Sequence, residues 1–275
     1  MASDDSFGDF ELAGWEDEAT AAEYDRQLSL VTIQSVEALL DDAGVERGHM
    51  VLDVATGAGY VAAAAAQRGA DSLGIDFSTT QVRLARARYP SIRFEQANAE
   101  ALPFDAESFE AVVNAFGLCH LPNPALALRE AFRVLKPGGR LAFSVWDQPE
   151  RALGFGALYA AIREHGSMDV GLPTGPNFFF FSSPEQSINA LRDAGFDSPT
   201  FRTVPQVWRS SDPDNLFAMM ATGTVRAAAT LRAQTSDARK LIREAMRQTI
   251  SAYQRDGECG IPMPAVVAAA AKPLR

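Results

Sequence analysis

Cysteine and histidine are scarce in this sequence of 275 residues, which contains two cysteines and three histidines. Cys119 and Cys259 do not form a zinc-ligand pair, and two cysteines do not make a disulfide framework. We therefore expect no bound metal. The low cysteine count also suits a reducing, cytoplasmic environment.

Long apolar runs are missing as well. No uninterrupted apolar run reaches the ~18 residues that a membrane span requires. Residues 1–18 are acidic and lack the apolar core of a secretory signal, so we expect a loose N-terminal arm there rather than a targeting segment.

Basic residues are outnumbered: 25 lysines and arginines stand against 35 aspartates and glutamates, which gives a net charge of −10. Proteins that bind nucleic acid or an anionic membrane surface usually present a basic patch. The acidic balance therefore argues against both as partners. The subunit number stays open between a monomer and a homodimer.

The chain does contain a regular alternation of short apolar runs and helical segments. The expected strands are residues 51–54, 72–76, 92–96, 109–116 and 140–146. Helical patterns lie between most of these runs, and a longer one precedes them over residues 19–42. Such an alternation predicts parallel βαβ units in a doubly wound α/β sheet.

The pattern is less regular after residue 146. We expect helices over residues 153–165 and 183–194, a strand over residues 200–209, two helices within residues 213–255, and a final strand over residues 261–271.

The turn after the first strand carries the clearest motif. Asp53 ends the apolar run, and Gly57-Ala58-Gly59-Tyr60-Val61-Ala62 fits the dinucleotide pattern G-x-G-x-x-G/A. Glycines allow a sharp turn close to a ligand, and the helix that follows offers free N–H groups to an anionic group. Asp76 ends the second run, where an acidic residue can hold ribose hydroxyls. The motif alone also fits a nicotinamide-dependent oxidoreductase.

Five ordered segments narrow this choice: residues 51–59, 74–78, 98–104, 117–124 and 135–141. Together they resemble the seven-stranded class of S-adenosylmethionine-dependent methyltransferases. Within that class the chain is similar to the branch that includes the ubiquinone and menaquinone C-methyltransferases and many small-molecule methyltransferases. Residues 24–26 also resemble the first helix of that branch.

This resemblance implies a fold, a cofactor and an activity. The implied fold is a doubly wound, mostly parallel seven-stranded sheet with helices on both faces. Residues 1–44 would form an N-terminal helical cap, and residues 45–275 the S-adenosylmethionine-binding domain, with a helical insertion at about 213–255. The implied activity is methyl transfer from S-adenosylmethionine to an O, N or C nucleophile of an aromatic or partly apolar small molecule.

Residue chemistry and the resemblance together suggest how the cofactor is held. Asp53 suits the ammonium group, the N–H groups around Gly57 and Gly59 suit the carboxylate, and Asp76 suits the ribose. The full expected cofactor set is Tyr24, Asp53, Ala55, Thr56, Gly57, Gly59, Asp76, Phe77, Gln81, Asn98, Ala99, Glu100, Asn114 and Ala115.

Two of these positions depart from the family pattern. Ala55 stands where the pattern has its first glycine. We expect its methyl group to be tolerated on a backbone of negative φ while it narrows the floor under the cofactor. Asn98 stands where many relatives have aspartate, and either side chain can meet the adenine amino group.

The acceptor side is less defined. His120, just after the fourth expected strand, is a candidate general base, with a structural or cofactor-side role as its alternative. Candidates for the substrate pocket are the aromatic residues Trp15, Trp146, Phe178, Phe179, Phe180 and Phe181. Asp53 argues against the oxidoreductase, because a carboxylate there would lie near the pyrophosphate. A protein of the same fold that cyclises or rearranges its substrate without methyl transfer stays open.

Overall fold

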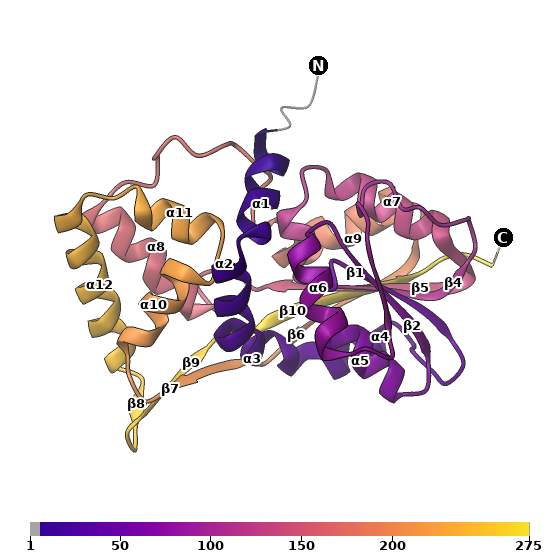
Figure 1. The fold of residues 1–275 in the computed structure, drawn as a ribbon, viewed down its shortest axis with the longest axis horizontal. Helices are drawn as coiled ribbons and strands as arrows, with labels where there is room; N and C mark the ends of the chain where they lie inside the picture. Colours follow the sequence, from indigo (N-terminus) through magenta and orange to yellow (C-terminus); the bar gives the residue numbers. More distant parts are fainter. Residues whose placement is uncertain (1–5, 275) are drawn as a thin grey trace.

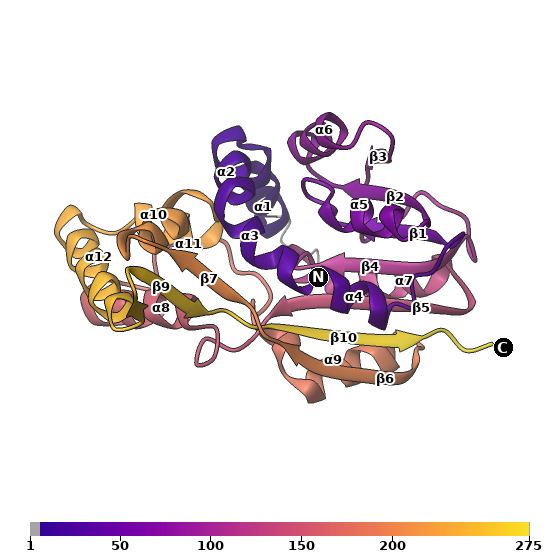
Figure 2. The same cartoon turned by 90° about the horizontal axis from the view of Figure 1, so that it is seen from below.

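A seven-stranded sheet forms the centre of the chain, as a computed structural model that describes residues 6–274 shows (Figures 1 and 2). Its strands are β1 (Met50–Val54), β2 (Asp71–Asp76), β3 (Arg93–Gln96), β4 (Phe109–Ala115), β5 (Leu135–Trp146), β6 (Asp197–Val204) and β10 (Ala265–Ala271). Their order is β3-β2-β1-β4-β5-β10-β6, and only β10 runs antiparallel to its neighbours. The predicted doubly wound, mostly parallel sheet is confirmed.

Helices cover both faces of this sheet. On one face α4 (Val36–Asp42) and α5 (Tyr60–Gln67) pack on Val51 and Ala111, and on the other α7 (Pro124–Val134) and α9 (Pro184–Asp193) pack on Leu52 and Val112. Successive strand residues point to opposite faces, so each strand contributes to both cores. α6 (Thr79–Arg88) packs against β3 at the sheet edge.

The alanine-rich segment at the C-terminal end of the chain is a strand, as predicted, although alanine favours helix. β10 is buried on both sides between β5 and β6, so tertiary packing overrides the intrinsic preference. It is shorter than predicted, because Pro264 separates it from β9 (Glu258–Pro262). The strand predicted over residues 200–209 is likewise divided at Pro205 into β6 and β7 (Val207–Ser210). β7, β9 and β8 (Gln254–Arg255) form a separate three-stranded sheet.

The expected loose arm is wrong for the part of it that the structure describes. α1 (Ser6–Glu16) is a regular helix, and residues 1–5 lie outside the described residues. The helical path predicted over residues 19–42 is present but changes pitch. It runs through α2 (Glu18–Glu23), the π-helix η1 (Tyr24–Leu28), α3 (Ser29–Thr32), the 3-10 helix η2 (Ile33–Ser35) and α4.

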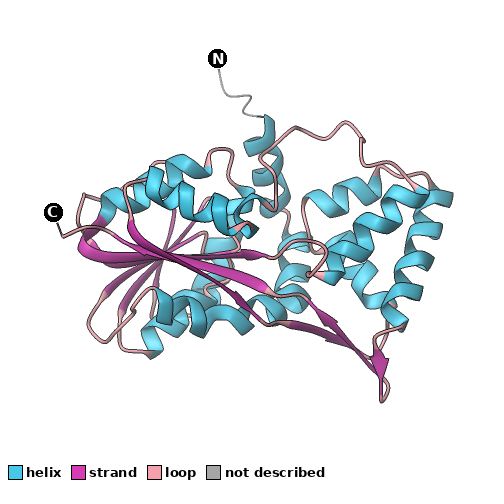
Figure 3. Ribbon diagram, turned by 180° about the vertical axis from the view of Figure 1, so that it is seen from behind, coloured by secondary structure: helices cyan, strands magenta, loops and turns pink. Residues whose placement is uncertain are grey.

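The insertion contains three helices rather than the predicted two: α10 (Asp214–Thr222), α11 (Arg226–Arg232) and α12 (Ser236–Ser251). Gly223 ends α10, and its N–H donates to the carbonyl of Met219. Together with α8 (Leu153–His165), these helices form a bundle beside the sheet, as seen from behind in Figure 3. α1 and α2 lie between the bundle and the sheet (Figure 1).

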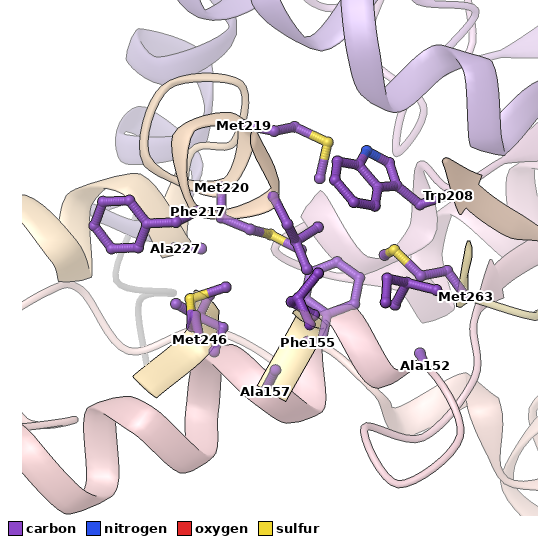
Figure 4. Packing of buried hydrophobic residues seen from close by; sticks show 14 of the residues in the cluster. Ala152, Phe155, Ala157, Trp208, Phe217, Met219, Met220, Ala227, Met246 and Met263 are labelled. Carbon is purple, nitrogen blue, oxygen red and sulfur yellow. The ribbon is translucent and has the colours of Figure 1, made fainter. Parts of the chain in front are cut away.

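A methionine-rich core holds this bundle together (Figure 4). Large members labelled in Figure 4 come from α8, β7, α10, α12 and the segment after β9: Phe155, Trp208, Phe217, Met219, Met220, Met246 and Met263. Methionine is flexible and polarisable, so it fills irregular spaces between helices of different origin.

Candidate functional site

A cavity of about 620 Å³ opens at the carboxyl ends of β1, β2 and β4. Open α/β sheets bind their ligands at this edge, and the volume lies in the range of small-molecule sites. α1 and η3 (Leu118–His120) complete the wall.

Twelve of the residues predicted from the sequence line this cavity: Trp15, Tyr24, Ala55, Gly57, Asp76, Phe77, Gln81, Asn98, Ala99, Glu100, Ala115 and His120. From α1 the sequence predicted only Trp15, and it missed Gly8, Asp9 and Leu12, which also line the cavity. Phe7, Glu11 and Trp15 are buried and spaced by four residues, and this helical periodicity was the available signal.

Asp53 lies beneath the cavity wall and holds the turn after β1. Its Oδ2 accepts hydrogen bonds from Thr56 Oγ1 at 2.6 Å and from the N–H of Ala62 at 2.9 Å. Its Oδ1 is buried and has no hydrogen-bond partner within residues 6–274. Burial raises the pKa of Asp53 to about 7, although the bonds from Thr56 and Ala62 oppose the shift. A buried oxygen of this kind fits a cationic donor such as an ammonium group.

Asp76 connects the ends of β1 and β2. Its Oδ2 accepts from the N–H of Gly57 at 2.9 Å, and its Oδ1 from the N–H of Ser78 at 3.0 Å. Burial raises the pKa of Asp76 to about 6 against these two bonds. The remaining lone pairs of its carboxylate can accept from a ligand diol.

Ala55 has a φ of 56°, so the negative φ on which we based the tolerance of its methyl group is not present. The left-handed conformation brings the N–H of Thr56 to the carbonyl of Ile75 at 2.8 Å, which ties the turn to β2. An L-residue other than glycine pays about 1–2 kcal/mol for this conformation. Gly59 is left-handed as well, and a Cβ there would lie 2.8 Å from the Phe94 ring.

Asn114 and Thr56 act on the backbone rather than on the cavity surface. Asn114 Nδ2 donates to the carbonyl of Val54 at 2.9 Å, and its Oδ1 accepts from the N–H groups of Gly117 and Leu118 at 3.0 and 3.1 Å. These bonds join the ends of β1 and β4. The shape of the cavity therefore also depends on four residues that do not line it: Asp53, Thr56, Gly59 and Asn114.

α1 is fastened to the sheet domain at its C-terminal end. The Glu16 carboxylate accepts from the N–H and the hydroxyl of Thr79 at 2.6 and 2.9 Å and from the N–H of Thr80 at 3.2 Å. The carbonyl of Trp15 accepts from Ser78 Oγ at 3.0 Å. Glu16 thus places a negative charge at the N-terminus of α6, where the helix dipole favours it.

His120 faces the cavity from η3. Its Nδ1 lies 2.8 Å from Oε2 of Glu11, a carboxylate of α1 that is only 2% exposed. Burial lowers the pKa of His120, but Cys119 and Glu11 outweigh it and raise the pKa well above its ordinary value.

The remaining aromatic candidates do not line this cavity. Trp146 is buried against Phe116, at 4.5 Å between ring centroids. Phe178 and Phe179 pack on the methionine-rich core. Phe180 and Phe181 line a second cavity of about 440 Å³ between α7 and α9. A substrate role for these residues therefore stays a prediction.

Within residues 6–274, no group of three or more histidine, cysteine, aspartate or glutamate side chains is placed to hold a metal ion. No helix in the same range is both long and apolar enough to cross a membrane.

The known proteins that this chain resembles are methyltransferases. Residues 52–143 match the model of a methyltransferase domain. The demethylmenaquinone methyltransferase of Renibacterium salmoninarum is 40% identical over 111 residues, which cover 40% of this chain and 47% of that protein. The enzyme of the same name from Paenarthrobacter aurescens is 32% identical over 190 residues, covering 64% of this chain and 75% of that protein.

A solved structure shows the same fold. The phosphoethanolamine N-methyltransferase 2 of Haemonchus contortus, in complex with S-adenosylhomocysteine, matches with a TM-score of 0.59 at 17% identity. The match covers 98% of this chain and 60% of that one. Among the sequence relatives, this chain matches about half the length of the Renibacterium protein and three quarters of the Paenarthrobacter one.

Proposed function

Since the chain belongs to the S-adenosylmethionine-dependent methyltransferases of the demethylmenaquinone methyltransferase-like branch, we propose that it transfers a methyl group to a small-molecule acceptor. The observation that carries the proposal is the cavity at the carboxyl ends of β1, β2 and β4, with the unpartnered Asp53 Oδ1 beneath it. S-adenosylmethionine is the cofactor of this family. When bound, it supplies an electrophilic methyl group on a sulfonium centre.

The residues around the cavity fit the parts of that cofactor. Asp53 Oδ1 is the partner for its ammonium, directly or through water. The N–H groups of Gly57 and Gly59 donate within the protein, to Asp76 Oδ2 and to the carbonyl of Thr56, so we propose that these glycines let the backbone approach the cofactor carboxylate without donating to it themselves. Asp76 accepts from the ribose hydroxyls. Asn98 and Ala99, which also line the cavity, are the partners that we propose for the adenine.

The walls of the cavity also favour one class of acceptor. Trp15, Tyr24, Phe116 and His120 contribute aromatic surface, and Asp9, which is not among the expected cofactor residues, contributes a carboxylate. An aromatic or partly apolar molecule without a negative charge suits such a lining. The two relatives described above are named as demethylmenaquinone methyltransferases. Methylation at O, N or C is compatible with the site. We further propose a cytoplasmic protein, monomeric or homodimeric, that does not act on nucleic acid.

Calorimetry and a labelled-methyl assay test this function. We expect the protein to bind S-adenosylmethionine and S-adenosylhomocysteine, and to transfer labelled methyl to a member of a panel of quinols, phenols and aromatic amines. Asp76→Asn should weaken binding of both cofactor forms. Binding of NADH in place of S-adenosylmethionine would contradict the proposal. Firm cofactor binding without transfer to any acceptor would favour a protein that cyclises or rearranges its substrate.

A further inference from the structure

The buried carboxylate of Glu11 has no role in holding the cofactor as described above. It comes from α1, which precedes the sheet domain, and it meets His120 Nδ1 from η3 at 2.8 Å. The pair joins segments that are 109 residues apart in the chain. A buried carboxylate is costly unless it is paired, so this contact fixes both side chains.

The contact also decides which ring nitrogen is available. Because Nδ1 faces a carboxylate, a neutral His120 ring keeps its hydrogen on Nδ1 and presents the lone pair of Nε2. The contact with Glu11 uses Nδ1, and the Cys119 side chain also interacts with the ring. His120 lines the cavity together with Ala115, Phe116 and Gly117 at the end of β4.

Two aromatic side chains hold the plane of this ring. Trp15 of α1 lies 5.2 Å from His120 between ring centroids at an interplanar angle of 87°, and Phe178 lies 5.7 Å away at 75°. These two rings and the bond to Glu11 therefore limit the rotation of the imidazole. A ring that is held in one orientation keeps its second nitrogen in a fixed position for proton transfer.

We propose that Glu11 and His120 form a proton-accepting dyad for the methyl transfer, with Nε2 of His120 as the base and Glu11 as its positioning residue. The inference rests on the proposed function. The bond between the acceptor atom and its hydrogen breaks, and the proton passes to Nε2. The electron pair left on the acceptor atom forms the bond to the methyl carbon, while the pair of the breaking carbon–sulfur bond stays on sulfur. The resulting imidazolium is paired with the Glu11 carboxylate.

The charged and titratable groups around His120 support this direction of transfer. Glu11 faces it from α1, Cys119 adjoins it in η3, and Asp76 of β2 acts on it through space. Carboxylates on two sides stabilise an imidazolium after it has taken a proton. They also raise the pKa of His120, so we expect transfer to increase with pH as the ring loses its own proton.

The dyad further couples chemistry to the position of α1. Glu11 lies on the helix whose Glu16 bonds to the start of α6 and whose Trp15 lines the cavity. The base is therefore oriented only while α1 covers the site.

NMR of the ligand-free protein with ¹⁵N-labelled histidine tests the dyad without any acceptor. The three histidines give few signals, and H120Q assigns the relevant one. We expect a titration above the ordinary pKa of ~6.5, and in the neutral form a hydrogen on Nδ1. E11Q, which keeps the shape, should lower the midpoint by about 1 pH unit or more. E18Q is the matched control, because Glu18 pairs with Arg83 on the surface.

Kinetic measurements then distinguish two roles of Glu11. It either positions His120 as a base, or it acts as a structural latch that only holds α1 against the sheet domain. H120Q should reduce kcat by about 100-fold or more with cofactor affinity changed less than about threefold. E11Q should lower kcat and move the pH midpoint of kcat to lower pH, whereas E18Q should change neither. An E11Q protein that weakens cofactor binding but keeps the wild-type pH profile would overturn the dyad in favour of a latch.

Two other results would also overturn the inference: an ordinary His120 titration in the wild type, and a titration that E11Q leaves unchanged. A wild-type protein that fails to bind S-adenosylmethionine while His120 titrates as expected would instead contradict the proposed function.

Discussion

The methyl group of Ala55 faces the α-carbon of Gly117, and both residues line the cavity. A Cβ on Gly117 would lie 2.6 Å from the Ala55 Cβ and 2.5 Å from Asn114 Nδ2, closer than real Cβ contacts. The turn after β1 and the turn after β4 therefore fit together only because one of these two positions lacks a side chain.

This opposition predicts the effect of substitutions at both positions. Ala55→Gly removes left-handed strain but adds backbone entropy to the unfolded state, so we expect stability to rise by about 0–1 kcal/mol. Gly117→Ala should cost about 1–3 kcal/mol through overpacking. In the double variant part of that cost should disappear, because the Ala55 contact is gone while the Asn114 contact remains. Urea unfolding of the four proteins measures the coupling, and strict additivity would contradict direct contact.

Cofactor affinity should rise with pH through the titration of the buried carboxylates. The pKa of Asp53 is about 7 and that of Asp76 about 6, so at pH 6 Asp53 is largely protonated. A cationic ligand prefers the carboxylate, and binding then releases protons. We expect the dissociation constant of S-adenosylmethionine to fall roughly tenfold between pH 6 and pH 8. Calorimetry in buffers of different ionisation enthalpy measures both effects.

Asp53→Asn should weaken binding at pH 8 by about tenfold or more and reduce its pH dependence, because the amide neither attracts an ammonium nor titrates. Asp71→Asn is the matched control, since Asp71 lies at the opposite end of β2 in an exposed ion pair with Arg93. Equal effects of the two variants would contradict a specific role for Asp53.

Glu16 should control how fast the cofactor leaves. Glu16→Ala removes the three hydrogen bonds that Thr79 and Thr80 donate to its carboxylate. Such a contact at a helix N-terminus is worth about 1 kcal/mol, so we expect the dissociation rate of S-adenosylhomocysteine to rise roughly fivefold. Stopped-flow fluorescence of Trp15 follows the release. Glu18→Gln, on the exposed side of α2, should leave the rate unchanged. A slower release in Glu16→Ala would show that α1 does not cover the occupied site.

The sequence is informative where local chemistry determines structure. The first four strands and the turn at Gly57 follow from apolar runs, glycines and terminal carboxylates, and these strands begin and end within one residue of the prediction. β5 begins five residues earlier than predicted, and the last two predicted strands are divided or shortened at prolines. Ala55 shows the limit of this reasoning: its sign of φ depends on the bond from Thr56 to Ile75 of the neighbouring strand, which no local pattern encodes.

The N-terminal segment shows a second limit. Its acidic composition suggested a solvated arm, yet the carboxylates of Glu11 and Glu16 have partners more than 60 residues away. Charge counts do not distinguish solvated side chains from paired ones. The acceptor site is least predictable, because it depends on how the helices of the insertion pack against the sheet domain.

The bundle beside the sheet should stabilise the fold without taking part in cofactor binding. Phe155 lies at its centre, 2% exposed, with its ring centroid 5.3 Å from Trp146 and 5.8 Å from both Phe178 and Phe179. Phe155→Ala should lower the free energy of unfolding by about 3–5 kcal/mol, because it leaves a cavity in a close-packed core. Tyr253→Ala, at an exposed ring beyond α12, should cost less than about 0.5 kcal/mol.

Thermal unfolding with and without S-adenosylhomocysteine separates the two roles. The cofactor cavity is lined by residues of the sheet domain, η3 and the N-terminal helices, with none from α8 or α10–α12. The increase in Tm that saturating ligand produces should therefore be the same in Phe155→Ala as in the wild type. The Tm of the variant should be lower than that of the wild type both with and without the ligand. Loss of that increase in Phe155→Ala would mean that the bundle holds the walls of the cavity, since a cofactor site independent of it should keep its affinity.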